Sequence, residues 1–77
     1  MTYIYITFSS THDALTFENT FKGRFPFRIV PVPREISTSC GIAARLDEKD
    51  SKTLEDALKK HPVAYGEIHK ITKQKPF

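Results

Sequence analysis

The stretch Tyr3-Ile4-Tyr5-Ile6-Thr7-Phe8, followed directly by Ser9-Ser10-Thr11, holds the clearest strand signal and the clearest helix start of the chain. Aromatic and β-branched residues alternate over residues 3–8, which predicts a strand whose even-numbered residues share one face. The hydroxyls that follow are typical of a helix N-cap. Asp13, three residues after Ser10, extends this signal to a variant of the capping box. A strand that leads straight into a helix is therefore the first unit of the fold.

The rest of the chain continues this alternation of elements. We expect the first helix to end near Gly23, and a second strand over residues 27–32. Pro31 interrupts that strand and has no N–H for a ladder hydrogen bond, so the strand should lie at a sheet edge. A third strand is predicted over residues 42–46. Asp47 is expected to cap a second helix, and a last strand should cover residues 65–71.

The order β-α-β-β-α-β predicts an α+β, ferredoxin-like fold, in which a four-stranded antiparallel sheet of order 4-1-3-2 carries both helices on one face. We expect residues 1–77 to form a single domain, with its core at about 3–71 and a tail at 72–77. The predicted core residues are Ile4, Ile6, Phe8, Leu15, Phe17, Phe21, Ile42, Ala44, Leu46, Leu54 and Leu58. The other sheet face has no helix over it, and we predict self-association (a homodimer) through Tyr3 and Tyr5 on that face.

Size and composition limit the kinds of site that the chain can hold. A chain of 77 residues with 39% hydrophobic residues buries one thin core and cannot also enclose a deep cavity, so functional residues belong on a loop or an edge. Its single cysteine excludes an intramolecular disulfide, a dithiol redox pair and a cysteine-rich zinc site. The first residues show no basic leader, and no stretch reaches the ~20 apolar residues of a membrane span. We therefore expect a cytoplasmic protein with no membrane association.

Other ligand classes have little support in the sequence. The net charge of +3 is mild and its lysines and arginines are scattered, which disfavours nucleic acid as a partner. The three glycines are too far apart for a phosphate-binding loop. The three histidines lack the spacing of metal ligands. We expect no metal and no cofactor.

The residue with the most distinctive chemistry is Cys40, in the loop before the third strand. In the predicted topology the segment Ser9-Ser10-Thr11-His12 ends the first strand at the same edge, so it should approach Cys40 and Gly41. The positive end of the first helix would then lie near the thiol, and both this helix end and a nearby cation lower a thiol pKa. Arg34 is the nearest cation along the chain. Gly41 suggests a positive φ or the close approach of another group.

Plainer explanations remain open for each of these residues. A lone cysteine in a small domain is most often buried and inert. Ser37-Thr38-Ser39 are good turn formers, His12 is more simply a solvated residue, and Arg34 could pair with Glu35. A non-covalent interaction or regulatory domain with a structural cysteine is therefore the alternative function, and weak RNA binding is a third one that rests only on charge.

The run Pro33-Arg34-Glu35-Ile36-Ser37-Thr38-Ser39-Cys40-Gly41-Ile42-Ala43, together with Ile6-Thr7-Phe8-Ser9-Ser10-Thr11-His12-Asp13-Ala14-Leu15, resembles a family of small bacterial domains, the selenium/sulfur carrier protein-like family. The resemblance spans Tyr3 to about Ile71. It implies a carrier, rather than a true enzyme, that holds sulfur or selenium on Cys40 as a persulfide or selenopersulfide. It also implies two partners, a cysteine desulfurase-like donor and an acceptor protein.

Overall fold

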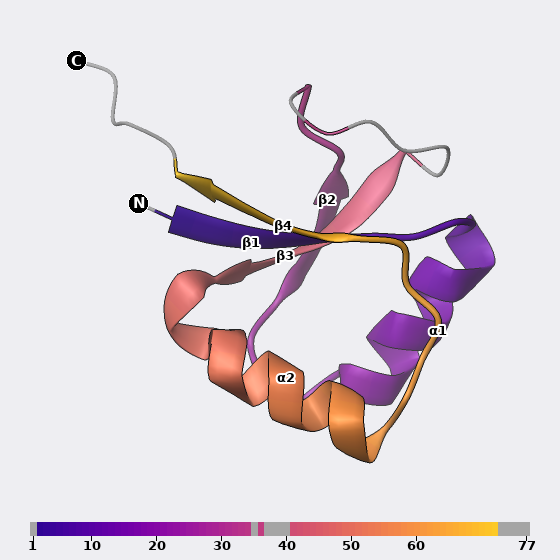
Figure 1. Ribbon diagram of the computed structural model, residues 1–77. Coiled ribbons are helices and arrows are strands. Elements are labelled where there is room, and N and C mark those ends of the chain that lie inside the picture. The colour runs from indigo at the N-terminus through magenta and orange to yellow at the C-terminus, as the bar shows by residue number, and fades with distance from the viewer. Residues whose placement is uncertain (1, 35, 37–40, 73–77) are drawn as a thin grey trace.

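The computed structural model describes residues 2–34, 36 and 41–72. Strands and helices alternate in the predicted order, and both helices lie on the same side of the sheet (Figure 1). The elements are β1 (Thr2–Thr7), α1 (Thr11–Phe21), β2 (Arg28–Pro31), β3 (Ile42–Asp47), a 3₁₀ turn (Glu48–Asp50), α2 (Ser51–Lys60) and β4 (Ile68–Thr72). The α+β class and the antiparallel sheet are confirmed.

The sheet has the strand order β2-β3-β1-β4, which is 4-1-3-2 when it is followed from the opposite edge. All three strand pairs are antiparallel, with β3 and β1 in the centre. Thr7 of β1 lies opposite Ala43 of β3, and Ile6 lies opposite Ile68 of β4. This register places the C-terminal end of β1 beside the N-terminal end of β3.

Proline is tolerated in β2 because of its place in the ladder. The Val32 N–H donates to the Gly41 carbonyl at 3.1 Å, just beyond the last residue of the strand. N–H groups that point to a given neighbour alternate along an antiparallel strand, so the nitrogen of Pro31 faces the free edge. No ladder hydrogen bond is lost there, and the proline keeps the edge from pairing with another strand.

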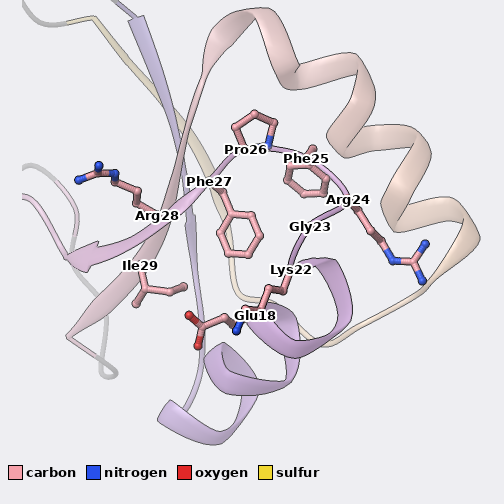
Figure 2. Close-up of a pocket in the computed structure, with 9 residues that line it drawn as sticks. All are labelled: Glu18, Lys22, Gly23, Arg24, Phe25, Pro26, Phe27, Arg28 and Ile29. Carbon is pink, nitrogen blue, oxygen red and sulfur yellow. The ribbon is translucent and has the colours of Figure 1, made fainter.

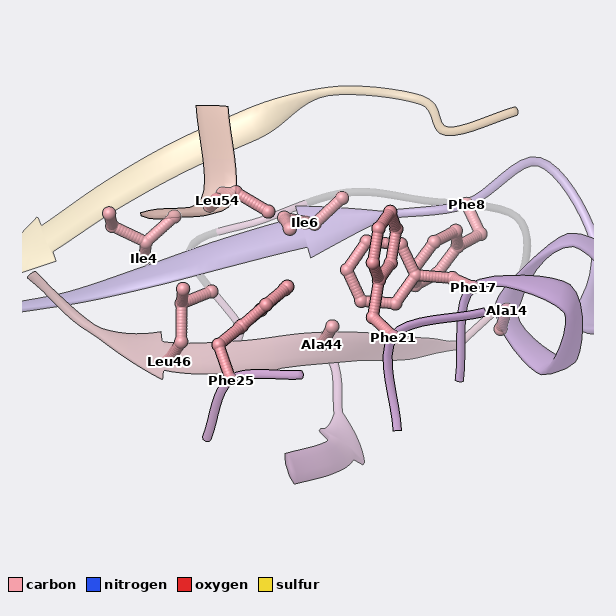
Figure 3. Close-up of a cluster of buried hydrophobic side chains, with 10 residues drawn as sticks. All are labelled: Ile4, Ile6, Phe8, Ala14, Phe17, Phe21, Phe25, Ala44, Leu46 and Leu54. Atoms are coloured by element: carbon pink, nitrogen blue, oxygen red, sulfur yellow. The ribbon is translucent and has the colours of Figure 1, made fainter. Parts of the chain in front are cut away.

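The main core fills the space between the sheet and the two helices, and it is dominated by phenylalanine (Figure 3). Phe17 of α1 is fully buried, with its ring centroid 5.4 Å from that of Phe8 and 4.8 Å from that of Phe21. Tilted and edge-on aromatic pairs of this kind stabilise a core beyond the area they bury, by roughly 0.5–1.5 kcal/mol each.

Two details of the predicted core were wrong. Leu15 is 51% exposed, because Ala14, Phe17 and Phe21 define the buried stripe of α1 and Leu15 lies about 100° around the helix from Ala14. Phe25, in the connection after α1, takes part in the core instead and is 7% exposed. Of the other predicted core residues, Ile42 and Leu58 are only partly buried.

The helix caps follow the sequence signals in one of two cases. The Ser10 Oγ accepts a hydrogen bond from the Asp13 N–H at 3.2 Å, as the capping pattern predicts. Asp47 does not cap the second helix. Its carboxylate accepts from the Lys49 N–H at 3.0 Å and starts the short 3₁₀ turn, so that α2 begins only at Ser51.

The last strand is shorter than predicted because of Thr7. A continuing ladder would send the Glu67 N–H to the Thr7 carbonyl, but this N–H donates to the Thr7 hydroxyl at 2.9 Å. The Gly66 N–H donates to the Thr7 carbonyl instead, at 2.7 Å. Regular pairing therefore begins only at Ile68, although the chain stays bonded to the end of β1.

We expect Gly66→Ala to destabilise the fold by about 1–3 kcal/mol, the usual range for an overpacked site. A Cβ at this position would lie 2.9 Å from the Thr7 Oγ1 and 3.4 Å from the Thr7 carbonyl oxygen. Urea unfolding measures the loss, and a double-mutant cycle with Thr7→Ala tests its cause. The double variant should lose less stability than the sum of the two single variants, and strict additivity would contradict this steric explanation.

Candidate functional site

The centre of the predicted site, Ser37 to Cys40, lies outside the described residues, and so does Glu35. The structure does place residues on both sides of this segment: Val32 to Arg34, Ile36 and Gly41. The local geometry of the site is therefore built from these flanking residues and from the end of β1.

Two backbone hydrogen bonds shape the flanks of the loop between β2 and β3. The bond from the Val32 N–H to the Gly41 carbonyl closes the base of the loop. Inside it, the Ile36 N–H donates to the Pro33 carbonyl at 3.0 Å and forms a four-residue turn. The connection thus leaves the sheet edge and bends back at once, which brings Ile36 over the sheet.

Ile36 is the apolar anchor of this loop. Its side chain is 6% exposed and packs in a cluster with Tyr5 and Ala43 on the face of the sheet that the helices leave free. We call this set, with the partly buried Tyr3, Val30, Val32 and Ile71 around it, the outer cluster. The domain therefore has two apolar layers, one on each side of the sheet.

The outer cluster corrects the expectation that this sheet face is open. Tyr5 is 3% exposed, because the chain's own loop covers it with Ile36. The prediction of self-association through Tyr5 assumed that this side chain is exposed, and it is buried. The sequence signal for this cover was a single isoleucine among the polar residues of the loop, four positions before Cys40.

Gly41 ends the loop in a conformation that favours glycine. Its φ is +82°, as expected, and a Cβ built on it would have no heavy atom within 4 Å. The glycine is thus needed for its backbone angle rather than for the close approach of a neighbour. A left-handed residue at this point sets the direction in which the chain enters β3.

The segment Ser9 to His12 lies at the end of the sheet where this loop begins β3. Thr7 and Ala43 are partners in the ladder, so the chain that follows Thr7 and the chain that precedes Ala43 lie at the same end of the sheet. Thr11 and His12 are exposed in the first turn of α1. The N-terminus of α1 therefore lies at the predicted end of the sheet, and the N–H groups of its first turn lie there too.

The predicted topology also puts the turn His61-Pro62-Val63-Ala64 at this end of the sheet, and the structure contradicts this. The ring of His61 lies 6.3 Å from that of Phe21, at the opposite end of α1 from Ser10. His61 therefore serves the far end of the core. Only the later residues Gly66 and Glu67 reach the end of β1.

Arg34 is exposed in the turn before Ile36. Among the residues that the structure describes, it forms no ion pair, and its pairing with Glu35 falls outside them. Its guanidinium can therefore meet an anion near the loop.

Metal and membrane chemistry find no support in the described part of the chain. Within it, no three His, Cys, Asp or Glu side chains gather as metal ligands. None of its helices is long and apolar enough to cross a bilayer.

A hollow lies at the far end of β2 from the loop (Figure 2). It has a volume of about 830 Å³ between α1 and β2, and Phe27 points into it while Arg24 and Arg28 extend to either side. None of the side chains that line it is a thiol, a hydroxyl or an imidazole. It therefore offers no thiol for covalent chemistry, and the loop remains the candidate site.

Comparison with known proteins supports the resemblance found in the sequence. The model of the family described as "Putative Se/S carrier protein-like" matches residues 3–70. The match spans both segments that carry the resemblance, including Cys40. No curated protein and no solved structure matches the chain.

The two left-handed glycines give a matched test of the loop. Gly41 and Gly23 have φ values of +82° and +80°, and neither has an atom in the way of a Cβ. Replacing either by alanine should therefore cost a similar amount, about 1 kcal/mol in the free energy of unfolding. Only Gly41→Ala should also change the rate at which iodoacetamide alkylates Cys40 in the native protein. Equal alkylation rates in the two variants would show that Gly41 does not position the thiol.

Proposed function

The chain belongs to the Se/S carrier protein-like family, and we propose that it holds sulfur or selenium on Cys40 as a persulfide or selenopersulfide and passes it to a partner protein. The single observation that supports this role most strongly is the loop itself, which is anchored on one side of the thiol by Ile36 and fixed on the other by Gly41. Both flanks of the segment that carries Cys40 are therefore tied to the sheet.

Loading would occur by exchange at sulfur. The Cys40 thiolate attacks the terminal sulfur of a persulfide on the donor, a cysteine desulfurase-like enzyme, and a new S–S bond forms on Cys40 while the donor's thiolate leaves. Delivery repeats the same step, with the acceptor's nucleophile attacking the terminal sulfur and the Cys40 thiolate leaving. No net oxidation or reduction takes place in either transfer, and the same scheme holds for selenium.

A single thiol suits a carrier. With no second cysteine in the chain, nothing internal can attack the persulfide, form a disulfide and release the cargo as sulfide. The cargo can leave only to a nucleophile outside the chain. Because a lone thiol stays free in a reducing compartment, we place this function in the cytoplasm.

The cargo is an anion, and the site has groups that would stabilise it. Arg34 has a free guanidinium among the described residues, and the hydroxyls of Ser37, Thr38 and Ser39 lie next to Cys40 in the sequence. The positive end of α1, which begins after Ser10, lies at the same end of the sheet. These groups favour the thiolate as well as the persulfide, so we infer that the pKa of Cys40 lies below the ordinary value for a thiol.

Ser9, Thr11 and His12 have supporting roles in this proposal. They line the turn between β1 and α1 at the sheet end that the loop shares, and Thr11 and His12 are solvent-exposed. We assign them to the rim against which a partner's cysteine approaches the loop. None of them is needed for the transfer steps, so the chain acts as a carrier and not as an enzyme with its own turnover.

Intact-mass measurement tests the proposal. After incubation with a cysteine desulfurase and cysteine, the protein should gain the mass of at least one sulfur atom, and a reducing thiol should remove it. Cys40→Ser should show no gain and should still unfold cooperatively at a similar urea concentration, because a carrier thiol has to be accessible to its partners and then adds little to stability.

Arg34→Ala supplies the second arm of this experiment, with Lys52→Ala as its control, because each variant removes one exposed positive charge and Lys52 lies on α2. Loading should slow in Arg34→Ala and stay unchanged in Lys52→Ala. A mass gain that survives in Cys40→Ser would refute the proposal. An unfolded Cys40→Ser protein would identify the cysteine as structural and favour a non-covalent docking domain.

A further inference from the structure

Two arginines face each other on the outer side of the sheet. Arg28 of β2 lies directly opposite Arg45 of β3 in the antiparallel register. Arg45 is also the partner of Tyr5 on β1, so both arginines lie on the face that carries the outer cluster. Figure 2 shows the Arg28 side chain directed away from Phe27 and from the helix side of the sheet.

Like charges directly opposite each other in a sheet are destabilising. Within residues 2–34, 36 and 41–72, neither arginine forms an ion pair. The one partner of Arg45 there is the ring of Tyr3, with its guanidinium carbon 4.9 Å from the ring centroid. Asp47 lies next to Arg45 on this face, but its carboxylate is bonded to the Lys49 N–H.

Arg28 and Arg45 both line a hollow of about 350 Å³. Arg28, Arg45 and Lys49 line it together with the carboxylates of Asp47 and Asp50, so that cations outnumber anions by one. Across the sheet, the Glu67 carboxylate lies 3.1 Å from the His69 Nε2, so it is paired with His69 and not with either arginine. The residues that line the hollow therefore carry one net positive charge, which an acidic group of a partner can neutralise.

We propose that Arg28 and Arg45 dock an acidic surface of the donor or acceptor protein while its reactive cysteine meets the loop. This inference deepens the proposed function and rests on it. Gly41 lies four residues before Arg45 of β3, a distance of about 13 Å at ~3.3 Å per residue. An ordinary interface covers about 800 Å² on each partner, which is enough to span both the arginines and the loop.

An acidic protein fits this face better than a nucleic acid does. Proteins that bind single-stranded RNA on a sheet stack its bases on exposed aromatic rings. Here Tyr5 is buried under Ile36, and the ring of Tyr3 is occupied by Arg45. The carboxylates of Asp47 and Glu67 on the same side would also repel a phosphate backbone, whereas a protein surface can present its carboxylates to the arginines alone.

Binding to a labelled polyglutamate chain, measured by fluorescence anisotropy at low and at physiological salt, tests the proposal. The wild-type protein should bind it in a salt-dependent way, and Arg28→Gln with Arg45→Gln should weaken binding by about tenfold. The control, Lys52→Gln with Lys59→Gln, removes the same charge from exposed positions of α2 and should change the affinity by less than about twofold.

Three outcomes would overturn the proposal: no binding by the wild-type protein at low salt, equal losses in the two double variants, or tighter arginine-dependent binding to poly(dT) of equal charge. Chemical loading of Cys40 from a small-molecule persulfide needs no docking, so it should be unaffected in the Arg28→Gln, Arg45→Gln protein. This second measurement separates a failure of the docking surface from a failure of the carrier function.

Discussion

The packing of Ile36 onto Tyr5 and Ala43 is the interaction on which the candidate site depends. Without it, the connection between β2 and β3 would be a polar loop attached to the sheet only at its base. With it, a buried side chain ties the loop to the two central strands, one of which continues into the turn before α1. The anchor therefore fixes one flank of the segment that carries Cys40 relative to the sheet.

The same packing lets a small chain cover both faces of its sheet. A chain of 77 residues has few apolar side chains, and a sheet with helices on one face leaves its other face to solvent. Here the phenylalanine cluster fills the helix side, where Phe8, Phe17 and Phe21 are fully buried. The loop seals the middle of the other side with one isoleucine. The loop that carries the candidate site thus also stabilises the fold, and site and stability are coupled through Ile36.

Local patterns predicted the elements of this fold, and tertiary packing decided what they missed. Alternation in residues 3–8, the Ser10 cap and the need for a positive φ at Gly41 depend on near neighbours, and the structure has all three. The choice of Phe25 over Leu15 for the core depends on how α1 is rotated against the sheet. The cover over Tyr5 depends on a loop that folds back onto the sheet. The late start of β4 depends on one hydroxyl group, that of Thr7. None of these leaves a periodic signal in the sequence. Of the site, Arg34, Gly41 and the Ser9–His12 segment could be placed, while Ile36 was missed because an isolated apolar residue has no pattern.

The central claim is that this architecture holds Cys40 accessible and more acidic than an ordinary thiol. The most direct measurement is the rate of Cys40 alkylation by iodoacetamide as a function of pH, in the native protein and in the same protein unfolded in urea. The thiolate is the reactive form, so the midpoint of each profile gives the pKa of Cys40 in that state. We expect the native midpoint to lie at lower pH than the unfolded one. A native midpoint at the same or a higher pH, or a native thiol that does not react, would contradict the account.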